Sequence, residues 1–458
     1  MKQSLRRLLG YRPNRPGRRD FLKKAGALFG ATATTFWADS TLDAAVQNTQ
    51  RSSNPTQLRI TDLRVAVLAK APFTCPIIRI DTNQGISGYG EVRDGASKTY
   101  ALFLKSRILG MNPCNIEQIF RKIRQFGGIG RQAGGVVAIE EALWDLAGKA
   151  YNVPVYQMLG GKYRDRLRCY CDTPDINDPK IFGQRMKERV DKGFTWLKMD
   201  IGIGSHLRNV PGTVSGPSQP ERGREHTLTG VEITQKGAEV MADYIMKVRE
   251  VVGWEVPIST DHFGSMGVNS LIRLGKAFEK CNLAWMEDVL PWHEMDLIKQ
   301  ISQAVDVPIC TGEDIWLIDP FEKLCREHIV DVIQPDLSTS GGILETKRIG
   351  DMAQKFGVPM AMHMAGTPVC GFANAHCAAA TEGFLVMENH SVDIPWWDSL
   401  VDGVEKPVLN KGFIRVPEGP GLGFTLNEEA IKQHLLDPGY FEPTPEWDRE
   451  RSSDNLYT

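Results

Sequence analysis

Apolar, strand-like segments that end in a titratable residue recur at a nearly constant interval in the second half of the chain. Two of them are "LAWME", ending at Glu287, and "VPICTGE", ending at Glu313. The full series of end residues is Asp261, Glu287, Glu313, Asp336, His363 and Glu388, at intervals of 26, 26, 23, 27 and 25 residues. Each gap holds a polar, helix-length stretch, and one strand, one helix and two short loops fill such an interval. The pattern therefore predicts a run of βα units with a parallel sheet.

A closed barrel accounts for these end residues better than an open sheet does. In a barrel all strands end at one mouth, so six titratable residues would converge on one site, whereas in an open sheet they would spread along an edge. Upstream, "GFTWLKMDIG" reads as a further strand that brings in Lys198 and, two residues on and hence on the same face, Asp200. We therefore expect an α/β fold of the TIM-barrel type with its site at the mouth.

The chain on either side of this series does not show the βα repeat. Residues 56–168 contain "PIIRIDTNQGISGYGEV", with an Asn-Gln-Gly turn, and then helical stretches such as "GGVVAIEEALWDLAGKAYNV", which predict a small α+β domain. The barrel is expected over residues 169–400. Residues 401–458 read as strand and turn, and we expect them to pack back onto the first domain.

The amino-terminal stretch is strongly basic while the rest of the chain is acidic. Residues 1–24 have a net charge of +8, which leaves −10 for the rest of a chain with a formal charge of −2. An acidic body without a basic stripe argues against nucleic acid as a partner. The pair Arg18-Arg19, with "DFLKKAGALFGATATTFWA" after it, resembles a twin-arginine export signal. We expect residues 1–50 to be the signal and linker of an exported or periplasmic protein without a stable membrane span.

The strand-end residues divide into a metal site and a base. Three carboxylates on consecutive strands, Asp261, Glu287 and Glu313, form an all-oxygen set that suits Mg²⁺. On the next two strands Asp336 can hold the imidazole of His363 in the correct tautomer, which makes His363 a general base. A cation facing such a base is the equipment for removing a proton α to a carboxylate.

Two further strand-end residues complete the predicted catalytic set. Lys198 adds positive charge to the same centre, and Glu388 would donate a hydrogen bond if it were kept protonated. The acids that directly follow Glu287 and Glu313 are expected to sit in the strand-to-helix turns.

At this point the chain resembles the enolase superfamily, in its mandelate racemase and acid-sugar dehydratase branch. The motifs that carry the resemblance are "TDHFG", "WMEDVLP", "TGED", "PDLSTSGG", "MHMAGTP", "VMEN" and "AIEEALWDLAGKAYNVPVYQMLGG". The resemblance implies a (β/α)7β TIM-like barrel with an N-terminal α+β capping domain, Mg²⁺ at the three acids, the Asp336–His363 dyad and a homo-oligomer. Members that move protons on both faces of a carbon tend to have Lys-x-Lys on the second strand, where this chain has Lys198-Met199-Asp200.

Candidate substrate contacts come from three places. The long polar loop after Asp200 is expected to be a lid over a small anionic substrate, with His206, Arg208, Arg222, Arg224 and His226 as its contacts. His262 is adjacent to Asp261 and is expected on the opposite face of a regular strand, where it serves as an acid, as a substrate contact or in packing. His390 is expected to contact substrate, and Trp396 and Trp397 either wall the pocket or belong to the core.

One base without a second Lys favours dehydration over racemisation, because β-elimination of water needs only one base and an acid. We therefore expect a Mg²⁺-dependent sugar-acid dehydratase that gives a 2-keto-3-deoxy acid. Two alternatives stay open: a racemase or epimerase that uses Asp200 or Lys198 as its second base, and a non-catalytic sugar-acid binding protein.

Overall fold

The first sheet along the chain has three antiparallel strands, in the order β1 (Ile60–Leu68), β2 (Cys75–Thr82) and β3 (Ser87–Glu91). The computed structural model describes residues 54–174, 176–201, 210–215, 226–263 and 265–449. β2 and β3 join through the predicted Asn-Gln-Gly turn, in which Gly85 has a φ of +75° and its N–H donates to the Thr82 carbonyl. The strands expected in the predicted α+β domain are therefore present.

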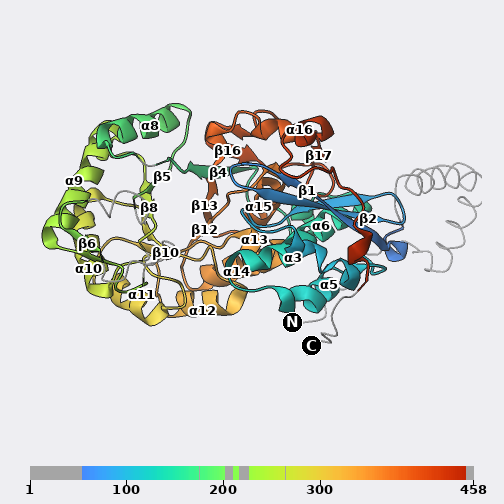
Figure 1. The fold of residues 1–458 in the computed structure, drawn as a ribbon, viewed down its shortest axis with the longest axis horizontal. Coiled ribbons are helices and arrows are strands. Elements are labelled where there is room, and N and C mark those ends of the chain that lie inside the picture. Colours follow the sequence, from blue (N-terminus) through green and yellow to red (C-terminus); the bar gives the residue numbers. More distant parts are fainter. Residues whose placement is uncertain (1–53, 175, 202–209, 216–225, 264, 450–458) are drawn as a thin grey trace, which may run out of the picture. The chain divides into compact units, whose positions relative to one another are not determined.

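Helix α6 (Gly134–Tyr151) packs on this sheet, and Figure 1 shows it beside β1 and β2. The contact is so close that β3 needs glycine. A Cβ at Gly88 would lie 2.2 Å from the Ala142 carbonyl oxygen, and one at Gly90 would lie 2.0 Å from that of Ala138. The shorter helices and 3-10 turns of this capping domain are η1 (Pro55–Gln57), α3 (Thr99–Leu102), α4 (Lys105–Ile108), α5 (Ile116–Ile123), η2 (Arg124–Phe126), η3 (Gly130–Ala133) and α7 (Val155–Met158).

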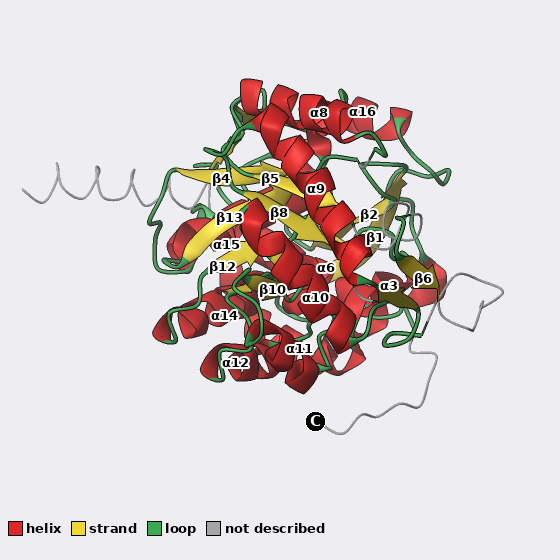
Figure 2. Ribbon diagram, turned by 90° about the vertical axis from the view of Figure 1, so that its left-hand side faces the viewer, coloured by secondary structure: helices red, strands yellow, loops and turns green. Residues whose placement is uncertain are grey.

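Eight parallel strands then close into a barrel, because the last of them pairs back with the first. They are β4 (Arg166–Cys171), β5 (Leu197–Asp200), β8 (Ile258–Asp261), β9 (Met286–Glu287), β10 (Ile309–Thr311), β11 (Val332–Ile333), β12 (Met360–Met362) and β13 (Phe384–Asn389). The helices between them are α8 (Pro179–Asp191), α9 (Gln235–Val252), α10 (Val268–Phe278), α11 (Met295–Ser302), α12 (Ile318–Arg326), α13 (Leu337–Ser340), α14 (Ile343–Lys355) and α15 (Pro368–Ala380), with η5 (Glu279–Cys281) after α10. Figure 2 shows the longer of these helices, among them α9, α10, α12 and α14, outside the strands. Short 3-10 turns, η6 (Ser391–Asp393) and η7 (Trp397–Leu400), follow β13, so the predicted (β/α)7β barrel is confirmed.

Several barrel helices begin where the sequence places a capping residue before proline or a polar stretch. The Asp178 side chain accepts the amides of Lys180 (2.8 Å) and Ile181 (3.3 Å) at the start of α8. Thr367 accepts the amide of Val369 (3.1 Å) at the start of α15. Proline at the first helical position follows both caps, since its missing N–H has no partner there in any case.

Side chains fill the barrel below its mouth. The inner layer consists of Tyr170, Trp285, Cys310, Val332, Ala361 and Val386, one from almost every strand. The barrel interior is thus a packed core, and room for a ligand lies only above it, where the strands end.

The carboxyl-terminal segment returns to both domains. β16 (Phe413–Arg415) pairs antiparallel with β4 and with β15 (Leu409–Asn410), while β14 (Val401–Asp402) pairs with β17 (Thr425–Leu426). After α16 (Glu428–Gln433) the amide of Leu436 donates to the Val67 carbonyl on β1 (2.8 Å). Buried Lys105 pairs with Asp448 (2.6 Å), next to η8 (Pro445–Trp447).

Within the described residues, no helix combines the length and the apolar character that crossing a bilayer requires.

A carboxylate of α6 connects the capping domain to the barrel. Glu140 accepts the backbone amides of Ile343 (2.8 Å) and Leu344 (3.2 Å) at the start of α14, and the indole N–H of Trp144 (2.6 Å). The Glu140 side chain therefore satisfies helix-end amides that would otherwise be buried without a partner.

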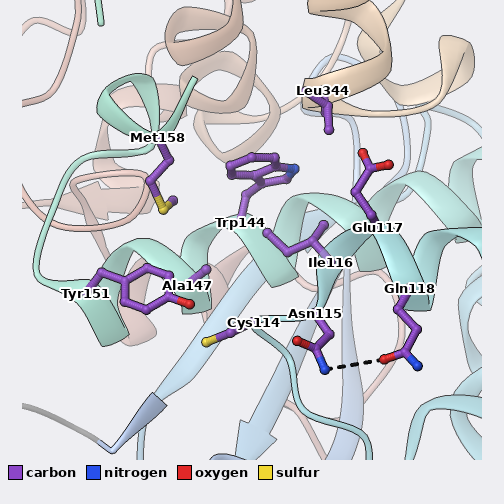
Figure 3. A pocket seen from close by; sticks show the side chains of 10 residues that line it. All are labelled: Cys114, Asn115, Ile116, Glu117, Gln118, Trp144, Ala147, Tyr151, Met158 and Leu344. Atoms are coloured by element: carbon purple, nitrogen blue, oxygen red, sulfur yellow. Dashed lines mark hydrogen bonds between the residues drawn. The ribbon is translucent and has the colours of Figure 1, made fainter. Parts of the chain in front are cut away.

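Trp144 and Leu344 also line a surface groove with Glu117 (Figure 3), and none of the predicted site residues lines this groove.

Glu140→Gln is expected to flatten the dependence of protein stability on pH. Burial raises the pKa of Glu140 to about 8, from an ordinary value of 4.5. The folded protein therefore holds this proton where the unfolded chain has released it, and the free energy of unfolding falls as pH rises from about 4.5 to about 8. Gln cannot ionise, so thermal or urea unfolding should show a fall smaller by at least about 1 kcal/mol in the variant. Glu117→Gln, at an exposed acid, is the control, and identical slopes for wild type and Glu140→Gln would contradict the account.

Candidate active site

The three acids predicted as metal ligands lie at the ends of neighbouring barrel strands. Asp261 and Glu287 are the last residues of β8 and β9, and Glu313 follows β10 by two residues. Their side chains are 1%, 1% and 15% exposed, respectively. Because buried carboxylates are strongly unfavourable unless they are paired, this cluster requires positive charge.

Lys198 on β5 supplies part of that charge. Its Nζ lies 2.6 Å from Asp261 Oδ2, 3.0 Å from Glu287 Oε1 and 2.9 Å from Glu388 Oε1. Although burial lowers the pKa of Lys198, the charges of these three carboxylates raise it well above the ordinary value. Lys198 is therefore a fixed ammonium among the acids rather than a neutral amine.

The donor set of the cluster fits a divalent cation. All three predicted ligands offer oxygen, which Mg²⁺ prefers. Asp261 Oδ2 is buried, and Lys198 Nζ lies 2.6 Å from it. Burial, together with the charge of Asp261, raises the pKa of Glu287 well above its usual range. The negative charge of the cluster thus exceeds what its protein partners balance, and Asp261, Glu287 and Glu313 are the residues that would hold Mg²⁺.

Arg93 of the capping domain is a cation of this site that the sequence had not indicated. Its side chain is fully buried; Nη1 donates to the Glu313 carbonyl (2.6 Å) and to Thr339 Oγ1, and Nη2 lies 3.3 Å from Glu313 Oε1. Its Nε lies 3.6 Å from Asp336 Oδ2. Burial lowers the pKa of Arg93, but the charges of Asp336 and Glu313 have the larger effect and raise it above its ordinary value. Arg93 thus connects Glu313 with Asp336 at the mouth of the barrel.

The predicted dyad is assembled on neighbouring strands. His363 Nδ1 and Asp336 Oδ2 share a hydrogen bond, and the two residues form a parallel bridge beyond β11 and β12. His363 Nε2 faces inward, 3.2 Å from Glu313 Oε2 and 3.8 Å from Glu388 Oε2. This geometry fixes one tautomer and leaves Nε2 as the atom that can accept a proton.

The charge around His363 controls whether it can act as a base. Burial lowers the pKa of His363, but the charges of Glu313 and Glu388 and the hydrogen bond to Asp336 raise it to about 10. Burial raises the pKa of Glu313, but the charges of His363 and Arg93 lower it to about 2. A positive ion held by Glu313 would offset this attraction and favour the neutral, basic form of His363.

Glu388 on β13 lies among hydrogen-bond donors. The Tyr170 hydroxyl donates to its Oε2 (2.9 Å), as does Gln334 Nε2 (3.4 Å), and Lys198 and His390 contact its Oε1 at 2.9 and 3.1 Å. Burial raises the pKa of Glu388, but the charges of Lys198 and His363 lower it well below the ordinary value. Glu388 is thus a carboxylate that accepts hydrogen bonds from its neighbours, and the condition for it to donate one, a retained proton, is not met.

Asp200 and His262 lie side by side at the mouth. Asp200 ends β5 in register with Asp261, and burial and the charge of Asp172 raise the pKa of Asp200 to about 7. His262 Nε2 lies 3.8 Å from Asp200 Oδ2 and its Nδ1 lies 3.5 Å from Asp261 Oδ1. The expectation that His262 points to the opposite face is wrong, because β8 ends at Asp261 and His262 has a φ of +69° that redirects its side chain.

The other predicted substrate contacts fall partly outside the described residues. His206, Arg208, Arg222 and Arg224 lie in segments that the structure does not describe, so their lid role stays a prediction. His226 is exposed, and its Nδ1 accepts the amide of Leu228 (3.3 Å).

The two tryptophans have different surroundings. Trp397 is buried in the core and its indole N–H donates to the Gly366 carbonyl (3.0 Å). Trp396 stacks on His434, with 3.8 Å between ring centroids. Trp397 therefore belongs to the core, as one of the two alternatives predicted, whereas Trp396 is half-buried against His434.

Asp172 is a strand-end acid that the sequence reading passed over. It follows β4 in "RCYCD", the same arrangement as in the other strands, so the repeat itself contained the signal. Its Oδ2 lies 3.4 Å from His390 Nδ1. Trp285, whose indole N–H donates to Glu287 Oε2 (2.9 Å), and Gln334 were also missed, because an indole and an amide in apolar strands carry no sequence signal of their own.

Asp288 lies in the strand-to-helix turn, as expected. Its φ is +46°, its amide donates to the Cys310 carbonyl (3.0 Å), and its Oδ1 accepts the Thr311 hydroxyl (2.6 Å). Burial raises the pKa of Asp288 to about 8. Its side chain thus supports β10 beside Glu313.

Two family descriptions match the chain in the order of its two folded parts. "Mandelate racemase / muconate lactonizing enzyme, N-terminal domain" matches residues 43–160, and "Enolase C-terminal domain-like" matches residues 182–430. Among solved structures, a mandelate racemase/muconate lactonizing enzyme-like protein from Rubrobacter xylanophilus has a TM-score of 0.74 and 30% identity, over 84% of this chain and 99% of the other.

Curated relatives match over most of the chain. D-xylonate dehydratase of Haloferax volcanii is 31% identical over 82% of this chain and 89% of its own length. D-gluconate dehydratase of Thermoproteus tenax is 28% identical over 79% and 70%, and arabinonate dehydratase of Saccharolobus solfataricus is 26% identical over 81% and 93%. The chain therefore belongs to the mandelate racemase / muconate lactonizing enzyme family of the enolase superfamily and groups with its acid-sugar dehydratases, which are hydro-lyases.

Proposed function

We propose that the protein is a Mg²⁺-dependent dehydratase of a sugar acid, an aldonate or aldarate, that forms a 2-keto-3-deoxy acid. The observation that carries the proposal is the Asp336–His363 dyad, whose free Nε2 faces the buried carboxylates and Lys198. The relatives named above are dehydratases of aldonates, which supports that substrate class.

Each residue of the site has a step to perform in this reaction. When bound, Mg²⁺ supplies a Lewis acid that lowers the energy of the doubly charged enediolate. His363 Nε2 takes the proton from the carbon next to the substrate carboxylate, and Asp336 stabilises the resulting imidazolium through Nδ1–H. Lys198 adds a fixed positive charge close to the same carboxylate. Loss of the hydroxyl from the neighbouring carbon, as water, completes the elimination.

The surroundings of Lys198 favour dehydration over epimerisation. Inverting a stereocentre needs a second base on the opposite face of the carbon, and Lys198 is held in its charged form by three carboxylates within 3.0 Å. An ammonium in that state cannot accept a proton.

The test is a panel of aldonates and aldarates, beginning with D-xylonate, D-gluconate and arabinonate, incubated with the protein and Mg²⁺ and assayed for keto-acid formation. At least one acid should give a 2-keto-3-deoxy product that EDTA suppresses and added Mg²⁺ restores. Binding of these acids without any keto acid or α-proton exchange would overturn the proposal and favour a binding protein.

We also propose that residues 1–50 direct export through the twin-arginine route. Support comes from the order of the Arg18-Arg19 pair, Phe21-Leu22-Lys23 and the weakly apolar run. Replacing Arg18 and Arg19 with Lys is expected to lower the periplasmic fraction at least about tenfold in a bacterial host, measured by immunoblot of cell fractions. The same replacement at the other pair, Arg6-Arg7, is the control. An unchanged periplasmic fraction in the Arg18-Arg19 variant would refute this role.

A further inference from the structure

His390 and Asp172 form a second imidazole–carboxylate pair at the mouth of the barrel. They follow the neighbouring strands β13 and β4, whose last residues, Asn389 and Cys171, are register partners. His390 Nδ1 lies 3.4 Å from Asp172 Oδ2, and both side chains are largely buried, at 16% and 13% exposed. The pair therefore repeats, on the strands that close the barrel, the arrangement of the Asp336–His363 dyad.

The second pair lies beside the first, because His363 and His390 follow the paired strands β12 and β13. The ring centroids of His390 and His363 are 6.4 Å apart. His390 Nε2 is directed into the site, 3.1 Å from Glu388 Oε1, and the ring of Phe73 from the capping domain packs edge-on against it at 6.1 Å. The two imidazoles thus lie next to each other at the mouth, each with Nδ1 beside an aspartate and Nε2 within 3.8 Å of Glu388.

The surroundings keep a proton on His390. Burial lowers the pKa of His390, but the hydrogen bond to Glu388 and the charges of Glu388 and Asp172 raise it above the ordinary value. Asp172 Oδ1 is buried and has no hydrogen-bond partner, so this carboxylate has acceptor capacity beyond its contact with His390. His390, with a carboxylate beside each ring nitrogen, is therefore equipped as a proton donor.

We propose that His390 is a further catalytic residue, the general acid that protonates the departing hydroxyl, with Asp172 as the residue that positions it. The proposal rests on the dehydratase function proposed above. The Cα–H bond breaks and its proton goes to His363 Nε2; the bond between the next carbon and its hydroxyl oxygen then breaks, and that oxygen takes the proton from His390 Nε2 and leaves as water. The enol that remains takes a proton at C3 and becomes the keto acid. No oxidant or reductant is needed.

The first test separates the two proton transfers. His390→Gln keeps a side-chain amide that can bond to Glu388 but cannot give up a proton. With the aldonate that wild type converts, D-xylonate being tried first, dehydration should fall about 10²- to 10³-fold. Exchange of the α proton in recovered substrate in D₂O should continue, so that the ratio of exchange to dehydration rises at least about 100-fold. Asp172→Asn should raise the same ratio by a smaller factor, and His328→Gln, at an exposed histidine before β11, is the matched control.

The second test uses the 3-deoxy-3-fluoro analogue of the same aldonate. Fluoride leaves as a stable anion and needs no proton from the enzyme, whereas hydroxide is a poor leaving group. Fluoride release by His390→Gln should therefore stay within about threefold of wild type. Equal losses of dehydration, exchange and fluoride release would mean that His390 has only a structural role, and unchanged dehydration would also refute the proposal. Absence of any keto acid with wild type, in contrast, would refute the dehydratase function itself and the role of His390 with it.

Discussion

His363→Asn is expected to slow α-proton exchange and water elimination together, by about 10³- to 10⁴-fold. Asn retains an amide that can donate to Asp336 from near the Nδ1 position, but it has no atom at Nε2, the nitrogen that faces Glu313 and Glu388. In the proposed mechanism both reactions begin with proton transfer to Nε2, so removing this atom should slow both to the same extent. Proton NMR in D₂O measures both, from the α-proton signal of the substrate and the signals of the keto acid.

The control for this variant is its fold and its affinity for Mg²⁺. Circular dichroism should be unchanged and the Mg²⁺ dissociation constant should stay within about threefold of wild type, because His363 is no ligand of the cation in this account. His328→Asn, at the opposite end of the barrel, should behave as wild type. Exchange that persists within about tenfold of the wild-type rate would show that another group is the base.

Glu287→Gln and Asp288→Asn are expected to differ sharply although the two residues are adjacent. Glu287 is fully buried beside Asp261 and Lys198 and offers its carboxylate to the site. Its neutral amide should weaken Mg²⁺ binding at least about 100-fold, about 2.7 kcal/mol, as measured by isothermal titration calorimetry. Asp288 faces Thr311 instead, and Asn can accept the same hydroxyl and tolerates the left-handed backbone, so its effect should stay below about tenfold.

The comparison also discriminates between ligand sets. If Asp288→Asn weakened Mg²⁺ binding as much as Glu287→Gln, then Asp288 would have to turn toward the cation and the assignment of ligands to strand ends would be wrong. If neither change affected Mg²⁺ binding, the cation would lie elsewhere, for example at the group of Asp200, Asp261 and His262, whose ligand atoms lie within 4.8 Å of one another.

The barrel and the location of its site could be predicted because both follow from local regularities. A βα unit has a fixed length, and parallel strands of a barrel end at one mouth, so the spacing from Asp261 to Glu388 was sufficient to predict one site. The same regularity applies to Asp172, which directly follows β4, the first strand of the barrel. It was overlooked only because the repeat was read from later strands.

Other parts of the site depend on properties that local pattern does not encode. Arg93 reaches Glu313 across 220 residues of sequence, and no periodicity links a strand of the small domain to a barrel strand. His262 departs from strand alternation because its φ is +69°, a backbone state that a non-glycine residue rarely adopts. The ionisation of Glu388 depends on four neighbours from four separate segments, Lys198, His390, Tyr170 and Gln334.

We propose that the residues at the mouth of the barrel remove an α proton from a sugar acid and then eliminate water. The measurement that tests it most directly is proton NMR of wild-type protein, Mg²⁺ and a converted aldonate in D₂O, with both carbons of the reaction followed in one sample. We predict a 2-keto-3-deoxy acid with deuterium incorporated at C3 and no epimer of the substrate. Exchange with inversion of the α carbon and no keto acid would contradict the claim and identify the protein as an epimerase.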